Sequence, residues 1–244
     1  MNELLAGKVA VITGASRGIG RGLAIGFAAQ GARVVCAARS QDQLEDTVMQ
    51  IQAAGGEAVA VRCDVTEAAD LQSLYDQTRA HYGPVDIVIA NAGGNFTRDS
   101  VEYSDIGDWE TTLRVNLLGV YYTCKYAIVD LKRQGGHIIV IGSGMGHRVG
   151  GSGSAYSVSK AGAWMLVRSL AAELRPHGIC VNELIPGLVN TDILSADEVP
   201  DESPLTLEWF KQPADVLPLA LFLATQPRTG PTGQSFSLMR RDSQ

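Results

Sequence analysis

The apolar residues of the chain fall into two kinds of segment. Short runs rich in Val, Ile and Ala are almost continuously apolar, as in strands covered on both faces of a sheet. Longer segments repeat apolar residues every three or four positions and often end in glycine, as in amphipathic helices. The predicted strands span residues 8–14, 32–39, 57–65, 85–93, 135–143, 178–187 and 233–239. The predicted helices span residues 20–31, 41–56, 67–82, 103–127 and 156–175.

The predicted strands and helices alternate along the sequence, which indicates a parallel sheet joined by right-handed crossovers. The predicted fold class is therefore α/β: a doubly wound, Rossmann-type domain with a seven-stranded parallel sheet flanked by helices. No linker or internal repeat divides the 244 residues, so we predict a single domain over residues 1–244.

Composition supports a globular protein and excludes some classes of partner. The chain is 45% hydrophobic and 19% charged, which is enough apolar content for a sizeable core. Its formal net charge is -6 and it has no basic stripe, so we expect no nucleic-acid partner. No apolar run approaches the roughly 20 residues of a membrane helix, so we expect no membrane partner.

The cysteines and the N-terminus indicate where the protein works. Cys36, Cys63, Cys124 and Cys180 are widely spaced and form no metal-binding pattern, as expected for small buried residues in a reducing compartment. The stretch MNELLAGK before the first strand is too short and too polar for a signal peptide. We therefore expect a cytoplasmic protein without a bound metal.

The first candidate for chemistry is the glycine-rich stretch TGASRGIG at residues 13–20, between the first strand and the first helix. Gly14, Gly18 and Gly20 have the spacing G-x-x-x-G-x-G, which differs from the general dinucleotide fingerprint G-x-G-x-x-G. The physical need is similar, because glycines let the backbone turn tightly and approach a pyrophosphate at a helix N-terminus. The stretch predicts a phosphate-binding turn.

The end of the second strand indicates which dinucleotide binds. An acidic residue about 20 residues after the glycine turn would accept a hydrogen bond from the ribose 2'-hydroxyl of NAD. Here the strand ends with Ala38, Arg39 and Ser40, with no carboxylate. Arg39 and Arg17 can form charge-assisted contacts with a 2'-phosphate, although both could also be solvated loop charges. The missing acid favours NADP(H) over NAD(H).

Tyr156 and Lys160 are four residues apart in the stretch SAYSVSK, so a helix would place both on one face. Such a pair is often only a solvated helix face. It is also a possible general acid and base, because an ammonium about 4.5 Å from a phenolate supplies on the order of 3–4 kcal/mol at an effective dielectric constant of about 20. A free tyrosine, with a pKa of about 10, needs stabilisation of this size to exchange protons near neutral pH.

The motifs together resemble those of the classical short-chain dehydrogenase/reductase family, in the same order and over essentially the full length of the chain. The matching motifs are TGASRGIG (13–20), CDV (63–65), NAG (91–93), Asn116 in VNLLG, Ser143 after IIVIG, YSVSK (156–160) and PGLVNT (186–191).

The resemblance implies a catalytic tetrad of Asn116, Ser143, Tyr156 and Lys160. Tyr156 would protonate the carbonyl oxygen in reduction, and Lys160 would tune Tyr156 and hold the nicotinamide ribose. Ser143 would bind the substrate oxygen, and Asn116 would hold a water that links Lys160 to solvent. The family often has a second serine directly before the catalytic one, where this chain has Gly142.

The resemblance also implies the residues that contact the dinucleotide. Asp64 and Val65 would meet the adenine, and residues 186–191 would flank the nicotinamide. Asn91 would either contact the cofactor or tie strands together. The full set of implied cofactor contacts is Gly14, Ser16, Arg17, Gly18, Ile19, Gly20, Arg39, Ser40, Asp64, Val65, Asn91, Ala92, Gly93, Tyr156, Lys160, Pro186, Gly187, Val189 and Thr191.

Three segments are expected to frame the substrate pocket: residues 93–98, residues 144–151 and a substrate lid at about 188–212. The last is rich in acidic residues and proline, and loops of such length tend to be functional.

Within these segments, Asn95, Phe96, His147 and Arg148 are the candidate substrate contacts. His147 and Arg148 would bind an anionic substrate group, or else are solvated loop residues. Phe96 would supply an apolar wall, as would Trp209, or else both pack in the ordinary way.

The predicted function is reduction of a ketone or 3-oxoacyl thioester by an NADPH-dependent carbonyl reductase. The same residues would serve the oxidation of a sugar, polyol or other secondary alcohol. A third possibility is a non-catalytic dinucleotide-binding module, but a complete tetrad argues against it.

The helices predicted at 103–127 and 156–175 have apolar faces beyond what one sheet needs to cover, with Trp164, Leu166 and Val167 on the second. The family commonly pairs these helices across two-fold axes. We therefore expect a homotetramer, with a homodimer as the next possibility.

Overall fold

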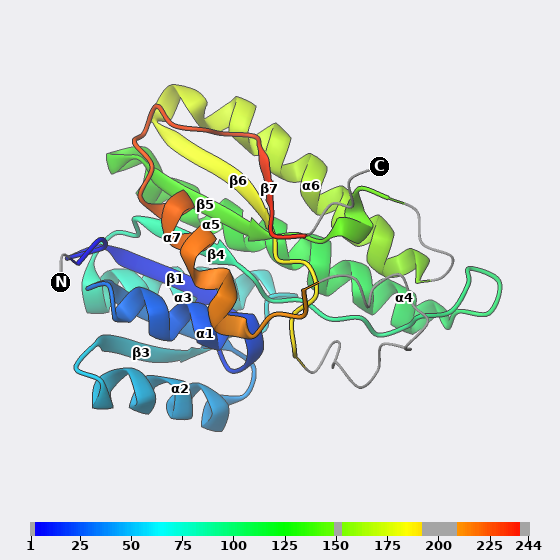
Figure 1. The fold of residues 1–244 in the computed structure, drawn as a ribbon, viewed down its shortest axis with the longest axis horizontal. Helices are drawn as coiled ribbons and strands as arrows, with labels where there is room; N and C mark the ends of the chain where they lie inside the picture. The colour runs from blue at the N-terminus through cyan, green and yellow to red at the C-terminus, as the bar shows by residue number, and fades with distance from the viewer. Residues whose placement is uncertain (1–2, 149–152, 192–208, 240–244) are drawn as a thin grey trace.

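The computed structural model describes residues 3–148, 153–191 and 209–239, which form one parallel sheet between two layers of helices (Figure 1). The strands are β1 (Val9–Thr13), β2 (Arg33–Ala38), β3 (Glu57–Arg62), β4 (Ile87–Ala90), β5 (Gly136–Ile141), β6 (Ile179–Ile185) and β7 (Ser235–Ser237). Their order across the sheet is β3-β2-β1-β4-β5-β6-β7, and every pair is parallel. The predicted fold class is therefore confirmed.

Helices cover both faces of the sheet (Figure 1). The α-helices are α1 (Gly18–Ala28), α2 (Gln41–Ala53), α3 (Ala68–Tyr82), α4 (Ile106–Leu113), α5 (Gly119–Gln134), α6 (Ser154–Leu174) and α7 (Leu217–Ala224). A π-helical turn, Arg114–Leu118, joins α4 to α5. Short 3-10 turns lie at Gly144–Gly146, Arg175–His177 and Pro213–Val216.

Two hydrophobic cores lie on opposite faces of the sheet because successive strand residues point in opposite directions. In β1, Val9 and Val11 belong to the core under α3, α5 and α6. Ala10 and Ile12 belong to the core under α1, α2 and α7. Burial on both faces explains why the strands read as continuous apolar runs.

The strand order reverses at the centre of the sheet, because the chain leaves β3 at one edge and returns as β4 beside β1. Parallel strands all present their carboxyl ends at one edge, and a reversal of this kind opens a crevice there. The fold therefore places any ligand site at the ends of β1, β4 and their neighbours.

The observed helices differ from the predicted ones in two places. The helix predicted at 103–127 begins at Ile106, contains the π-helical turn and runs to Gln134. Helix α7 was not predicted, because its sequence LPLALFLA is apolar almost throughout and shows no helical repeat. Within the described residues, no helix is both long enough and apolar enough to cross a membrane.

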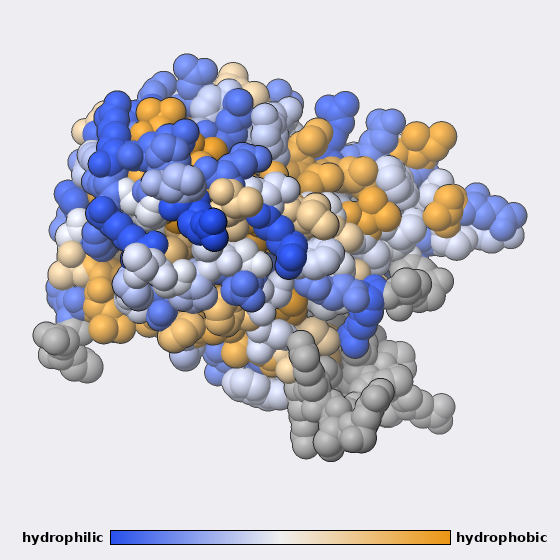
Figure 2. Space-filling view, turned by 90° about the horizontal axis from the view of Figure 1, so that it is seen from above, coloured by the Kyte–Doolittle hydropathy of each residue, from blue (hydrophilic) through white to orange (hydrophobic). Residues whose placement is uncertain are grey.

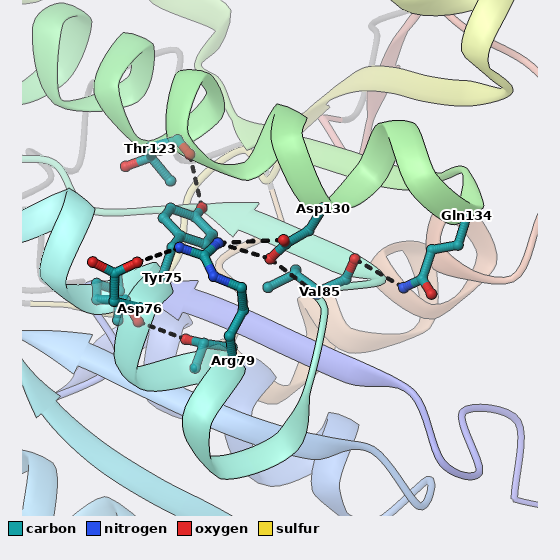
Figure 3. A network of polar contacts seen from close by, with 9 residues as sticks. Tyr75, Asp76, Arg79, Val85, Thr123, Asp130 and Gln134 are labelled. Carbon is teal, nitrogen blue, oxygen red and sulfur yellow. Dashed lines mark hydrogen bonds and ion pairs between the residues drawn. The ribbon is translucent and has the colours of Figure 1, made fainter.

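A buried ion pair connects α3 to α5 on the face away from α1 (Figure 3). Asp130 of α5 is fully buried, and both of its oxygens accept hydrogen bonds from Nη1 of Arg79, at 3.2 and 3.3 Å. Asp130 also accepts a bond from the backbone N of Val85, just before β4. Arg79 contacts the exposed carboxylate of Asp76 as well. Because the Asp130 side chain is buried, Arg79 supplies the opposite charge that its carboxylate cannot obtain from water.

Burial also controls the chemistry of the cysteines. It raises the pKa of the Cys36, Cys63 and Cys124 thiols to about 12. These thiols therefore stay protonated at neutral pH and are poor nucleophiles.

Replacing Arg79 tests the role of the ion pair in stability. We expect Arg79→Leu to lower the free energy of unfolding by about 3 kcal/mol, because it leaves the Asp130 carboxylate buried without its partner. Urea unfolding followed by circular dichroism measures the change. The control is Asp76→Asn, which removes the exposed carboxylate on the same arginine and should cost less than about 1 kcal/mol. Equal losses in the two variants would contradict the assignment.

Candidate active site

Two adjoining cavities open at the carboxyl ends of the strands. The larger has a volume of about 790 Å³ and the smaller about 360 Å³. Both are lined by Ile19, Asn91, Gly93 and Thr191, so they form one continuous cleft. The cleft lies where the reversal of strand order predicts it.

Most of the residues expected to contact the dinucleotide line this cleft. Those in the larger cavity are Gly14, Ser16, Arg17, Gly18, Ile19, Arg39, Ser40, Asp64, Val65, Asn91, Ala92, Gly93 and Thr191. Those in the smaller cavity include Tyr156, Lys160, Pro186, Gly187 and Val189.

The glycine turn between β1 and α1 needs its glycines for geometric reasons. Gly14 and Gly18 have φ of +68° and +55°, in the left-handed region that favours glycine. Gly20 lines neither cavity, but a Cβ at this position would lie 2.1 Å from the carbonyl oxygen of Gly14. Its role is to let α1 pack directly against the turn.

The N-terminus of α1 faces the larger cavity and fits a pyrophosphate. The N-cap residue, Arg17, does not cap the first amides of the helix with its side chain. Uncapped amides and the positive end of the helix dipole stabilise an anion at this position. The turn, the helix end and the cavity therefore suit the phosphates of a dinucleotide.

Asn91 joins the end of β4 to the glycine turn. Its Nδ2 donates hydrogen bonds to the carbonyl oxygens of Thr13 at 2.9 Å and Gly14 at 3.3 Å. Thr13 Oγ1 in turn accepts bonds from the backbone amides of Asn91 and Ala92. The Asn91 side chain thus has a structural role in addition to its place in the cavity wall.

Two residues that support the glycine turn carry no signal in the sequence. Thr47, buried in α2, donates a hydrogen bond to the carbonyl oxygen of Ala15 at 3.1 Å. Arg21 of α1 donates from Nε to Thr47 Oγ1 at 3.0 Å and from Nη2 to the carbonyl oxygen of Ser16. Their role depends on the packing of α1 against α2, which no local pattern reveals.

Ser143, Tyr156 and Lys160 line the smaller cavity together. Ser143 lies two residues after the end of β5, and Tyr156 and Lys160 lie on the first two turns of α6. Ser143 Oγ accepts a hydrogen bond from the backbone N of Met145 at 3.2 Å. Since this bond uses a lone pair, the hydroxyl proton of Ser143 remains able to bind a substrate oxygen.

Lys160 is held close to Tyr156 by the backbone of the sheet. Its Nζ donates a hydrogen bond to the carbonyl oxygen of Ile141 at 2.9 Å and lies 5.7 Å from the centre of the Tyr156 ring. The carbonyl oxygen of Ile141 thus fixes the ammonium group of Lys160 beside the Tyr156 ring.

Asn116 is buried in the π-helical turn and lines neither cavity. Its Oδ1 accepts a hydrogen bond from the backbone N of Gly94, and its Nδ2 donates to the carbonyl oxygen of Gly94 at 2.7 Å. Nδ2 also reaches Ser159 Oγ at 3.2 Å. The side chain connects the loop after β4 to α6, next to Lys160.

The four candidate substrate residues do not all line the same cavity. Asn95 and Arg148 line the smaller cavity. Phe96 lines only the larger cavity, and His147 lines neither, because its Nε2 lies 2.8 Å from Oε2 of Glu183.

The expected lid is described only at its two ends. Residues 188, 189 and 191 line the smaller cavity, and Trp209 at the far end is exposed. Residues 192–208 lie outside the described part of the chain.

The chain is similar to proteins of one family along nearly its whole length. The model of the short chain dehydrogenase family matches residues 8–201. The 3-oxoacyl-(acyl-carrier-protein) reductase of Synechocystis sp. is 37% identical over 243 residues, covering 96% of each chain. The 3beta-hydroxysteroid dehydrogenase 1 of Eggerthella lenta is 34% identical over 246 residues, covering 96% of this chain and 92% of that protein.

Similarity extends to solved structures. A short-chain type dehydrogenase/reductase from Mycobacterium marinum superposes with a TM-score of 0.87 at 31% identity, covering 97% of this chain and 95% of the other.

Proposed function

The chain belongs to the short chain dehydrogenase family of oxidoreductases, and we propose that it is an NADPH-dependent reductase of a ketone or a 3-oxoacyl thioester. The observation that carries the proposal is the meeting of Ser143, Tyr156 and Lys160 in one cavity that opens into a larger, dinucleotide-sized one. A non-catalytic dinucleotide-binding module would have no need of this arrangement.

The proposed reduction gives a role to each of Ser143, Tyr156 and Lys160, which line the smaller cavity. Bound NADPH would supply the hydride. The Ser143 hydroxyl binds the carbonyl oxygen, and Tyr156 donates a proton to it as negative charge develops. Lys160 stabilises the phenolate that remains, and its fixed contact with Ile141 keeps the ammonium in place. Asn116 supports the site by holding the loop at Gly94 against α6.

The same residues would also catalyse the reverse reaction. The relative in Eggerthella lenta is named for a hydroxysteroid, which is a secondary alcohol. Oxidation of a secondary alcohol, including a sugar or polyol, is therefore the second candidate function.

The preference for NADP(H) rests on the end of β2 and the glycine turn. Arg17, Arg39 and Ser40 line the larger cavity, and residues 38–40 contain no carboxylate that could bind a ribose 2'-hydroxyl. Guanidinium groups at this end of the cleft suit a 2'-phosphate.

The proposed assembly is a homotetramer, or failing that a homodimer. Apolar side chains interrupt the polar surface of the face seen in Figure 2. The large hydrophobic side chains exposed in and around α5 and α6 are Leu118, Tyr121, Val129, Val158 and Met165. Burying such side chains in an interface is favourable, so they support association.

The cytoplasmic location expected from the sequence stays a prediction.

Tyr156→Phe tests the mechanism. We expect kcat to fall at least about a hundredfold, because the proton donor is gone. NADPH affinity should hardly change, since the ring still packs. Activity is measured as NADPH oxidation on a panel of ketones and 3-oxoacyl thioesters, and affinity by fluorescence titration. Tyr103→Phe, at an exposed position, is the control. A folded Tyr156→Phe variant with substantial activity would refute the mechanism.

Cofactor preference is tested at the end of β2. We expect the unmodified protein to have the higher kcat/KM with NADPH. Ala38→Asp combined with Arg39→Gln should shift the NADPH/NADH ratio of kcat/KM at least about tenfold toward NADH, because a charge-assisted hydrogen bond is lost and a ribose acceptor is added. Arg39→Lys, which keeps the charge, is the control. Equal kinetics with both dinucleotides in the unmodified protein would overturn the assignment.

Light scattering at micromolar concentration measures the assembly. We expect the mass of a tetramer or a dimer, and Val129→Lys with Met165→Lys should shift the mass downward, because charges cannot be buried in an apolar interface. A monomer mass for the unmodified protein would contradict the proposal.

A further inference from the structure

Glu183 is an acidic residue in the interior of β6, beside the cleft, and only 1% of its surface is exposed. Its Oε2 accepts a hydrogen bond from Ser235 Oγ at 2.5 Å and lies 2.8 Å from Nε2 of His147. Its Oε1 is buried and has no hydrogen-bond partner among the described residues. A carboxylate in such a place is costly, which indicates a role beyond packing.

The Glu183 carboxylate occupies the space next to Ser143 that a side chain at Gly142 would fill. A Cβ on Gly142 would lie 1.9 Å from Glu183 Oε1. Gly142 also continues the pairing of β5 with β6, since its amide donates a hydrogen bond to the carbonyl oxygen of Leu184 at 2.9 Å. The Glu183 carboxylate therefore packs against Gly142, the residue from which the loop of residues 143–148 leaves the sheet.

The far end of this loop is held by His147. Its ring pairs with Glu183 and packs against Trp164 of α6, with the ring centres 4.9 Å apart. Between the two ends, Gly146 lies against α6, because a Cβ there would come 2.9 Å from the backbone carbonyl carbon of Lys160. The loop is anchored at both ends, and the residue after His147 is Arg148, which lines the smaller cavity.

The smaller cavity is cationic although the chain as a whole carries a formal net charge of -6. Its described lining includes Arg98, Arg148 and Lys160, with no Asp or Glu. Lys160 is held by Ile141, and Arg98 also lines the larger cavity. Arg148 and Lys160 line only the smaller cavity, and of these two Arg148 is the one that the proposed proton transfer does not use. The apolar part of the lining includes Met145, Leu188 and Met239.

We propose that the substrate is a carbonyl compound with an apolar body and an anionic group, and that Arg148 binds this anion while Glu183, acting through His147, positions the loop that carries Arg148. The inference rests on the proposed function, since it names the substrate class of the same site. Arg148 is an exposed residue that lines the cavity, and a guanidinium pairs with a carboxylate or phosphate through charge-assisted hydrogen bonds.

The test compares keto acids of increasing chain length with their methyl esters, which differ from them in charge at the same reacting carbonyl. We expect the unmodified protein to have the higher kcat/KM for the acids. Arg148→Gln should lower the acid/ester ratio of kcat/KM by about ten- to hundredfold, the value of a charge-assisted hydrogen bond. Arg148→Lys keeps the positive charge and should therefore retain part of the preference for the acids over the esters. Arg175→Gln removes an exposed arginine beyond the far end of α6 and is the matched control.

The positioning role is tested at His147, because Glu183 variants risk misfolding. We expect His147→Ala to raise KM for the acids more than it lowers kcat. His147→Gln, which can still donate to Glu183, should restore KM. If His147 only stabilised the fold, His147→Ala would lower the melting temperature and would change the kinetics with the acids and with the esters to the same extent.

An acid/ester ratio near one, or a ratio that Arg148→Gln leaves unchanged, would overturn the inference while reduction of the esters still supports the proposed function. Failure to reduce any acid or ester of the series would overturn both.

Discussion

The structure depends on a close approach between two backbone segments, the end of β4 and the turn after β1. Gly20 lets α1 lie against Gly14 without a side chain between them, and Asn91 donates hydrogen bonds to the carbonyl oxygens of Thr13 and Gly14, at the start of the turn. A Cβ at Gly20 would meet both Gly14 and Asn91. This contact holds together the two strands between which the chain reverses its order, and so it creates the cleft.

The buried charged side chains have different partners at the cleft and away from it. Away from it, Asp130 is neutralised by Arg79 and serves to join α3 to α5. At the cleft, Lys160 is held by a backbone carbonyl rather than by a carboxylate, so its charge stays available to Tyr156. Glu183 has one oxygen in use and one without a described partner, next to the loop that carries Arg148. A low-dielectric interior makes each of these placements energetically significant.

Much of the fold could be predicted because its signals are local. Buried parallel strands are apolar on both faces, and glycine often follows the end of a helix, so the number of strands and their order along the chain follow from short windows of sequence. The predictions failed where those signals were weak: α7 is apolar without a repeat, and the helix that contains Asn116 is interrupted by a π-helical turn that no propensity marks.

By itself, the sequence determined which chemical groups are present and which lie on a common element: the glycine turn with Arg17, Arg39 after β2, and Tyr156 four residues before Lys160 on one helix. The tertiary structure alone decided which of these groups share a cavity, because that depends on strand order and on contacts between residues far apart in the chain. His147 and Arg148 are neighbours in the sequence, yet one pairs with Glu183 and the other lines the smaller cavity. Likewise, Gly142 leaves room for a carboxylate that lies 41 positions further along the chain, on the adjacent strand, where only the pairing of β5 with β6 brings it.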